Sequence, residues 1–197
     1  MKQKIILSIA ISILLCFSKT NFSQTLPVNT SGIYATATDF LQQKLTYEIN
    51  CNSKDKLKLN EFFGSSTGYI LYNGQRHTFD KTKVYGYRSC ANKNYRFCNH
   101  STYQILDTAG FYIYYQYRQE EITKGKEPVK KDEYFFSKND DGDIQLLTID
   151  NLTKAFPAND KFHYAIEQAF RSDKELMAYD NFRHAYKIKY FYNQSLK

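Results

Sequence analysis

The stretch Phe111–Glu121, FYIYYQYRQEE, places five aromatic rings in its first seven positions. Aromatic and branched residues of this kind favour a β-strand. Successive side chains of a strand point to opposite faces. One face therefore carries Phe111, Ile113, Tyr115 and Tyr117, and the other carries Tyr112, Tyr114, Gln116 and Arg118. Rings on both faces mean either that both faces are covered or that one face is offered to a partner.

Short apolar runs separated by turn sequences surround this stretch and predict further strands. Asn73-Gly74, between Gly68–Tyr72 and Gln75–Phe79, is the strongest hairpin signal, because a type I′ turn needs positive φ at both central positions. Further strands are expected over 45–50, from 57 onward, and over 83–89, 94–97, 103–106, 111–120, 133–137 and 144–148. Strands at this spacing predict an antiparallel meander.

The period of the apolar residues becomes helical from Asp150 onward. One helix is expected to end near Phe156-Pro157, and Asn159-Asp160 is expected to cap the next. Ser172–Glu175 has capping-box spacing and predicts a third helical segment. That segment would carry Leu176, Tyr179, Phe182, Tyr186 and Tyr190.

Strands followed by helices predict an α+β protein, in which an antiparallel β-meander sheet carries the C-terminal helices on one face. We expect a single domain over residues 25–197, with the meander extending to about residue 148 and the helical part covering residues 150–193. No internal repeat or low-complexity linker divides this range.

The N-terminus predicts a signal peptide over residues 1–24. Lys2 and Lys4 precede an apolar run, Ile5–Leu15, that is too short to span a bilayer and suits a secretory signal. Cleavage after Ser18 or near Ser23 fits the small residues there. Cys16 raises the lipoprotein alternative, but the large Leu15 before it does not suit a lipobox. The mature chain is expected in the periplasm, in the medium or at the cell surface.

Charge and hydropathy restrict the partners. Residues 1–24 carry three lysines and no acid, so removing them lowers the formal net charge from +7 to +4. This mild excess in an exported chain does not predict nucleic-acid binding. No later stretch is apolar for long enough to form a transmembrane helix. Carbohydrate, peptide or another envelope protein remain as partner classes.

Three cysteines, Cys51, Cys90 and Cys98, remain after cleavage. An oxidising compartment favours one disulfide and leaves one thiol. Cys90 with Cys98 is the shortest closure and is the pairing expected here. If residues 91–94 form the turn, however, Cys90 lies opposite Tyr95, and Cys51 becomes the alternative partner.

No motif assigns catalysis, a metal or a cofactor. His163 and Glu167 share a helix face, but a zinc site needs three or four ligands and the protease pattern is absent. The loop from Ser137 to Thr148 lacks the bidentate Glu of a calcium site. Glycine-rich phosphate loops and nucleophile elbows are also absent. We therefore expect no catalytic residue, no metal and no cofactor.

The chain has 18 tyrosines and no tryptophan. A tyrosine ring buries a large area and keeps a hydroxyl for hydrogen bonding, so it suits both cores and recognition surfaces. Tyr112, Tyr114 and Arg118 on one face of the aromatic strand are the candidate ligand-binding residues, with Tyr69 or Tyr87 on neighbouring strands. The alternative is that these rings fill the space between the sheet and the helices.

Four stretches carry a resemblance to a group of proteins: KVYGYRSCANKNYRFCNHSTYQIL (83–106), EYFFSK (133–138), LLTIDNLTKAFPANDKFHYAI (146–166) and YDNFRHAYK (179–187). They resemble small exported proteins of unknown function from Bacteroidetes. The resemblance implies an export route and an envelope role, and it supplies no substrate and no site residue.

The sequence therefore favours an exported, non-enzymatic binding or interaction module with a tyrosine-rich strand face. A hydrolase that acts on envelope or host polymers is one alternative. An envelope assembly or structural protein is the other.

Overall fold

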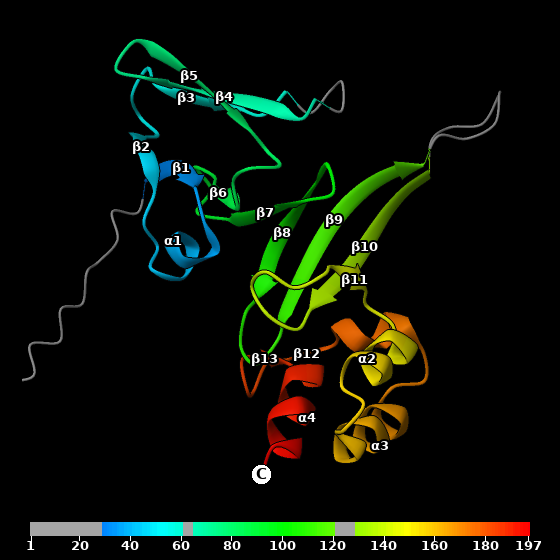
Figure 1. Cartoon of the computed structure of the whole chain (residues 1–197). Coiled ribbons are helices and arrows are strands. Elements are labelled where there is room, and N and C mark those ends of the chain that lie inside the picture. Colours follow the sequence, from blue (N-terminus) through cyan, green and yellow to red (C-terminus); the bar gives the residue numbers. More distant parts are fainter. Residues whose placement is uncertain (1–28, 61–64, 121–128) are drawn as a thin grey trace, which may run out of the picture.

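The computed structural model describes residues 29–60, 65–120 and 129–197, without the side chains of residues 118–120 and 129–131 (Figure 1). The predicted signal peptide lies outside these ranges. A large antiparallel sheet of eight strands has the order β11-β10-β9-β8-β7-β6-β1-β2. Its strands are β1 (Thr30–Tyr34), β2 (Thr46–Asn50), β6 (Gly86–Arg88), β7 (Asn94–Cys98), β8 (Ser101–Asp107), β9 (Tyr112–Glu120), β10 (Val129–Ser137) and β11 (Gln145–Leu146).

The meander prediction is confirmed from β6 to β11, because each of these strands pairs with the next one along the chain. The first strand was not expected. β1 lies between β2 and β6 and pairs with both, with Gly32 opposite Arg88 and Thr30 opposite Asn50. The chain thus leaves the large sheet after β2 and returns to it at β6.

A second sheet of three strands fills this excursion: β3 (Lys56–Lys58), β4 (Thr67–Tyr72) and β5 (Gln75–Asp80). The predicted hairpin is confirmed, since Tyr72 lies opposite Gln75 and both Asn73 and Gly74 have positive φ, at 50° and 76°. Ile70 of β4 is fully buried in a cluster with Ile33, Ile49, Tyr87 and Phe97 of the large sheet. The small sheet therefore covers the β1, β2, β6 and β7 end of the large one.

The C-terminal helices cover the other end of the same face (Figure 1). They are α2 (Ile149–Ala155), α3 (Asp160–Ala169) and α4 (Lys187–Ser195). Asn159 caps α3 as predicted, and α2 ends at Phe156. Leu152, Phe162 and Ile188 from the three helices pack against Phe111, Ile113 and Phe136 of the sheet. The α+β class with helices packed on the meander is thus confirmed.

The third predicted helical segment is wrong between residues 178 and 186, and only its two ends are helical. A short 3₁₀ helix (Asp173–Met177) is followed by a hairpin of β12 (Tyr179–Asp180) and β13 (Ala185–Tyr186). Ser172 makes no capping bond with its side chain. The Asp180 carboxylate accepts the backbone N–H groups of Phe182 and Arg183, which fixes a turn in competition with a helix. Phe182, expected in a helix, lies in the turn of this hairpin and is 89% exposed.

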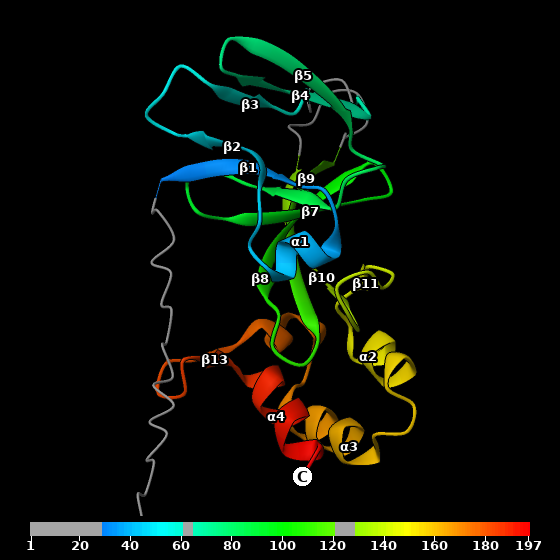
Figure 2. The same cartoon turned by 60° about the vertical axis from the view of Figure 1, so that its left-hand side comes forward.

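The opposite face of the large sheet carries α1 (Ala37–Leu41), which Thr36 and Asp39 cap reciprocally. Phe40 of α1 packs among Tyr34, Tyr103, Tyr112 and Tyr114. Figure 2 shows strands β1, β2 and β7 of the large sheet between the three-stranded sheet above and α1 below. No helix within the described residues has the length and apolarity needed to cross a membrane.

Candidate functional site

A row of aromatic and amide side chains crosses four strands of the large sheet. Tyr87 lies opposite Tyr95, Tyr95 opposite Gln104, and Gln104 opposite Tyr115. Directly opposed residues of antiparallel strands share a face, so these four side chains stand side by side. The rings of Tyr87 and Tyr95 stack at 4.6 Å with an interplanar angle of 4°. The row is thus a continuous polar and aromatic strip across the sheet.

The strip begins under the three-stranded sheet, where Tyr87 is buried in the core cluster with Ile70, and it runs toward the exposed part of β9. The three-stranded sheet covers the end formed by β1, β2, β6 and β7. The C-terminal helices cover Phe111, Ile113 and Phe136 at the other end. Between these covers the surface is hollowed into a groove of about 540 Å³. The described residues lining it are Lys81, Tyr87, Tyr95, His100, Ser101, Thr102, Gln104, Tyr115, Gln116 and Tyr117.

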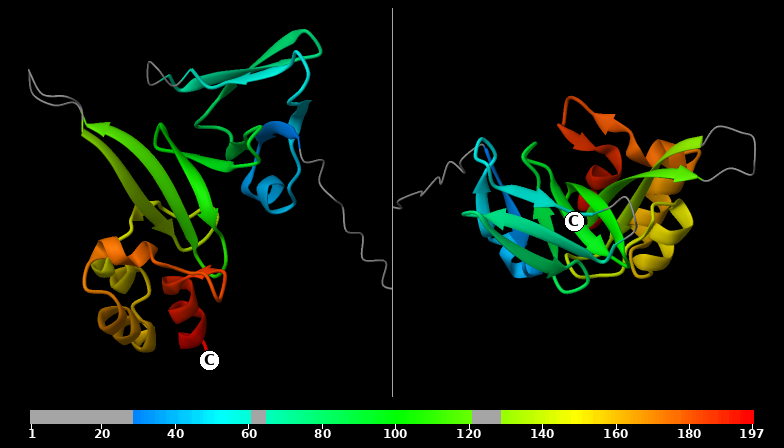
Figure 3. Two further views of the ribbon diagram at one scale, coloured as in Figure 1. Left: turned by 180° about the vertical axis from the view of Figure 1, so that it is seen from behind. Right: turned by 90° about the horizontal axis from the view of Figure 1, so that it is seen from above.

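Strand β9 separates from β8 (Figures 1 and 3), and residues of both strands line the groove. The register of β8 with β9 ends at Gln104 opposite Tyr115, whereas β9 continues to pair with β10 as far as Glu120 opposite Val129. A continued register would place Thr102 opposite Tyr117. Instead the Gln116 side-chain amide donates to the Thr102 carbonyl oxygen at 3.5 Å. A side chain therefore bridges the strands where a backbone pair would otherwise be.

The lining of the groove is chemically mixed. The hydroxyl of Tyr115 donates to the carboxylate of Asp132 at 2.7 Å, and this hydrogen bond raises the pKa of Tyr115 to about 12. Tyr117, two residues further along β9, is 50% exposed. Lys81 and His100 are the basic groups of the lining, and no carboxylate occurs among the described residues that line it. Hydroxyls, amides and rings thus dominate this surface.

The predicted open face at Tyr112 and Tyr114 is wrong. Tyr112 is 7% exposed, and Tyr114 is completely buried. The Tyr114 hydroxyl accepts a hydrogen bond from Arg96 Nη1 at 3.1 Å and lies 2.9 Å from Ser137 Oγ. Phe40 of α1 packs against Tyr112 and Tyr103 packs against Tyr114, and sequence spacing alone does not show these long-range contacts. Both belong to the core.

The third predicted residue of that set, Arg118, has a side chain outside the described residues. Its backbone pairs with Lys131 in the β9–β10 ladder. Of the neighbours considered, Tyr69 has the guanidinium of Arg76 over its ring, at 3.9 Å from the centroid, in the three-stranded sheet. Tyr87 of β6 lines the groove and lies on the sheet face that bears Tyr115, not on the face that bears Tyr112.

The exposed ring of β9 therefore lies on the face opposite to the one that carries the candidate residues Tyr112 and Tyr114. The candidate residues did not include Tyr115 and Tyr117, which share parity with Phe111 and Ile113. A usable signal existed in the preceding hairpin. A turn centred on Ala91 brings Tyr87 opposite Tyr95, and this is the register observed.

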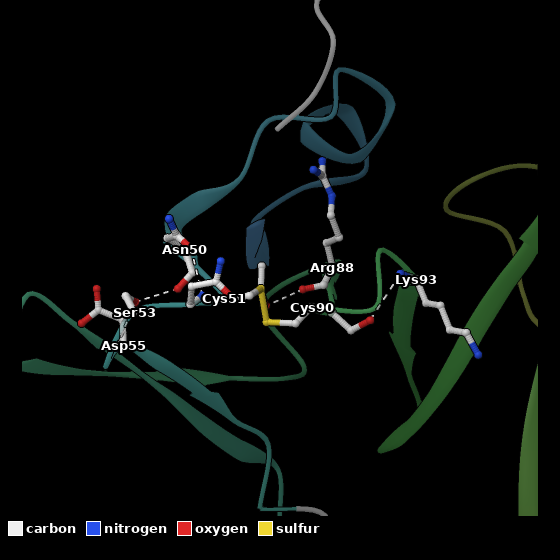
Figure 4. Close-up of a disulfide and its surroundings, with 10 residues drawn as sticks. Asn50, Cys51, Ser53, Asp55, Arg88, Cys90 and Lys93 are labelled. Carbon is white, nitrogen blue, oxygen red and sulfur yellow. Dashed lines mark hydrogen bonds between the residues drawn. A yellow bond between two sulfur atoms is a disulfide. The ribbon is translucent and has the colours of Figure 1, made fainter. Parts of the chain in front are cut away.

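The disulfide joins Cys51 to Cys90, so the expected Cys90–Cys98 pairing is wrong (Figure 4). Arg88 pairs with Asn94, which places Cys90 in the turn, and the length of β7 separates Cys98 from it. Cys51 and Cys90 instead follow the ends of β2 and β6, on either side of β1, with Cα atoms 5.6 Å apart. Cys98 is a half-buried free thiol.

Among the described residues, no group of three or more His, Cys, Asp or Glu side chains is arranged to hold a metal ion. His163, one of the residues considered for zinc, places Nε2 2.8 Å from the carbonyl oxygen of Phe156. This contact holds the ring against the end of α2.

Comparison with protein-family models, with curated proteins and with solved structures finds no match to this chain. Function must therefore be inferred from the groove itself. Its size falls in the range of ligand pockets, and its lining can stack on a ligand and exchange hydrogen bonds with it. It lacks the paired carboxylates that hydrolysis of a glycosidic bond requires, as far as the described lining extends.

Proposed function

We propose that this chain is an exported, non-enzymatic binding protein that holds a carbohydrate or a peptide in the groove between β8 and β9. The observation that carries the proposal is the row Tyr95, Gln104 and Tyr115 on the floor of a groove of about 540 Å³, with Tyr87 buried at the inner end of the row. Such a surface combines stacking area with hydrogen-bonding groups, as ligand pockets commonly do.

The geometry of the rings supports recognition. Tyr87 and Tyr95 stack on each other, and the Tyr115 hydroxyl is held by Asp132, so these three side chains are ordered before a ligand arrives. Ordered side chains lose less conformational entropy on binding, which improves affinity. Tyr117 adds an exposed ring at the edge of the groove.

The enzyme alternative has weaker support. A glycoside hydrolase needs two carboxyl groups on opposite sides of the scissile bond. The described groove lining contains none, and the Asp132 carboxylate near Tyr115 already accepts a hydrogen bond from its hydroxyl. An assembly role remains compatible with the proposal, because an envelope protein could present the bound segment.

Export belongs to the same proposal. The signal-like N-terminus is one support for it. The Cys51–Cys90 disulfide is the other, because disulfides form and persist mainly in oxidising compartments. The mature chain would then function in the periplasm or outside the cell.

The proposal is tested by screening the mature chain on a glycan array and against a phage library of random decapeptides. The ligands obtained are then measured against a double variant, Gln104→Ala with Tyr117→Ala. Tyr164→Ala is the matched control, because Tyr164 is a 69% exposed tyrosine of α3 that does not line the groove. Circular dichroism verifies that both variants fold.

We expect the groove variant to bind at least about tenfold more weakly, since it loses a ring contact and a hydrogen bond, and the control to bind as the wild type does. Ligands that bind the groove variant and the wild type equally would contradict the proposal. Failure of both screens to yield any ligand would also contradict it.

A further inference from the structure

The edge of β9 that faces the groove has no partner strand within the described part of the chain beyond Tyr115. On its other edge β9 pairs with β10 without interruption as far as Glu120. The segment from Gln116 to Glu120 therefore has one edge in a ladder and the other edge along the groove.

Two hydrogen bonds establish which backbone groups face the groove. Leu147 N–H donates to the Tyr134 carbonyl oxygen at 2.9 Å, so the Tyr134 carbonyl points away from β9. Tyr134 and Tyr115 are thus a non-hydrogen-bonded pair, and the backbone of Tyr115 points toward β8. Because the direction alternates along a strand, the N–H and C=O groups of Tyr117 and Gln119 also point toward the groove.

The β8 side gives the same result. Phe97 N–H donates to the Tyr85 carbonyl oxygen at 2.9 Å, so the backbone N–H and C=O groups of Phe97 point toward β6. The backbone groups of its partner Thr102 therefore point toward β9. The hydrogen bond from the Gln116 side-chain amide to the Thr102 carbonyl oxygen agrees with this direction. The groove is thus a split in one sheet, with backbone polar groups of β9 along one wall.

We propose that the ligand of this groove is an extended peptide of a partner protein that adds as a strand to β9. This inference rests on the proposed binding function and specifies its ligand. The peptide backbone forms up to four hydrogen bonds, with the N–H and C=O groups of Tyr117 and Gln119. Its alternate side chains face the rings of Tyr115 and Tyr117. Main-chain bonds then supply affinity, and the rings select the side chains.

The backbone pattern favours a peptide over a carbohydrate. Donor and acceptor pairs that recur at every second residue along an open edge match the periodicity of another polypeptide strand. A carbohydrate would use the rings and the side-chain amides and would leave these backbone groups to water. Aromatic or aliphatic side chains at alternate positions of the peptide fit the tyrosine floor.

The test uses a decapeptide enriched by phage display on the mature chain. Calorimetry compares its affinity for the wild type, Tyr117→Pro and Tyr117→Ala. Proline removes the N–H that faces the groove, whereas that N–H makes no bond to β10, so the β9–β10 ladder is retained. Tyr117→Ala separates loss of the ring from loss of the N–H. Circular dichroism and melting temperature verify the fold.

We expect Tyr117→Pro to bind about tenfold more weakly than Tyr117→Ala. A second series carries a single N-methyl group at each position of the peptide. Affinity should fall at every second position within the bound segment, where the peptide N–H points to β9. This periodicity does not depend on the stability of any protein variant.

Each other outcome overturns the inference in a recognisable way. Equal affinity of the proline and alanine variants, with no periodic effect of N-methylation, means that a peptide binds without strand addition, and the binding function remains. Ligands obtained only on the glycan array exclude a peptide but retain the groove. Absence of any ligand refutes both proposals. If sedimentation shows a wild-type dimer and a Tyr117→Pro monomer, a second copy occupies the edge instead.

Discussion

Gln104 and Tyr115 are opposed across β8 and β9 at the point beyond which the two strands separate. Their side chains lie on the floor of the groove, and the backbone of the next residues of β9 forms one wall. The same strand begins in the core, where Phe111 and Ile113 are completely buried under the C-terminal helices. The double-sided aromatic strand is therefore buried on both faces at its start and opens to a groove beyond Tyr115.

The first prediction concerns Tyr114, which packs in the core opposite the groove face. Tyr114→Ala should lower the free energy of unfolding by about 3–5 kcal/mol, because it leaves a large cavity and removes the partner of Arg96. Urea denaturation measures the change. Tyr117→Ala is the control on the same strand, and its effect should stay within about 0.5 kcal/mol because the ring is half exposed.

Tyr114→Phe separates packing from hydrogen bonding. It retains the ring and removes the hydroxyl that contacts Arg96 and Ser137. A cost of about 1–3 kcal/mol is expected, since the buried guanidinium loses a partner. A neutral Tyr114→Ala variant would contradict the assignment of this ring to the core.

The second prediction concerns the disulfide. Cys51 and Cys90 are 39 residues apart, and the chain-entropy relation gives about 4 kcal/mol for a loop of this length. Replacing both by serine should therefore destabilise the chain by a cost of this order in urea denaturation. Cys98→Ser is the matched control and should cost far less, because Cys98 is a half-buried free thiol. Peptide mapping under non-reducing conditions that links Cys90 to Cys98 would refute the pairing.

The third prediction concerns Lys189 of α4, which is only 2% exposed. Its ammonium donates to the carbonyl oxygens of Ala109 and Phe111 and lies 3.4 Å from Asp107. Burial lowers the pKa of Lys189 to about 8, although Asp107 opposes this shift. The helix is thus attached to the β8–β9 turn through one buried amine.

The lowered pKa gives a definite sign to the pH dependence. Between pH 8 and the unfolded value of 10.5, the unfolded chain binds more protons at this site than the folded chain does. The contribution of Lys189 to stability therefore rises with pH in this window, by at most about 1.4 kcal/mol per pH unit. Tyr114 and Tyr34 have raised pKa values, so their contribution is present below pH 10 and is lost above it.

Urea denaturation at pH 7.5, 8.5 and 9.5 tests this effect, and comparison with a variant that retains every tyrosine cancels their contribution. The free energy of unfolding of the wild type, minus that of Lys189→Met, should increase with pH. Lys187→Met, an exposed lysine of the same helix, should run parallel to the wild type. Parallel curves for Lys189→Met and the wild type would show that the amine does not titrate in this window.

Local sequence signals predicted the local structures well. Asn73-Gly74 identified the β4–β5 hairpin, and Asn159 identified the start of α3, because a turn and a cap each depend on a few adjacent residues. Ser172–Glu175 failed as a capping box, because the Glu175 carboxylate accepts the backbone N–H of Arg171 and the Ser172 side chain makes no capping bond.

Long-range features could not be predicted in this way. The position of β1 between β2 and β6 depends on pairing between segments more than fifty residues apart, and that pairing decides the disulfide. The groove depends on where β9 leaves β8 and on how far the two covering layers extend. Parity along β9 placed Tyr115 and Tyr117 on the face that bears Phe111. Only the extent of the C-terminal helices shows that these two tyrosines lie outside the region that the helices cover.

Amide hydrogen exchange by NMR, on the free mature chain, tests the central claim most directly. The backbone N–H groups of Tyr117 and Gln119 face the groove, whereas those of Gln116 and Arg118 point into the β10 ladder. We predict that the first pair exchanges at least about 100-fold faster than the second. Equal protection of all four amides would show that the edge of β9 is already paired, and the groove could not accept a strand.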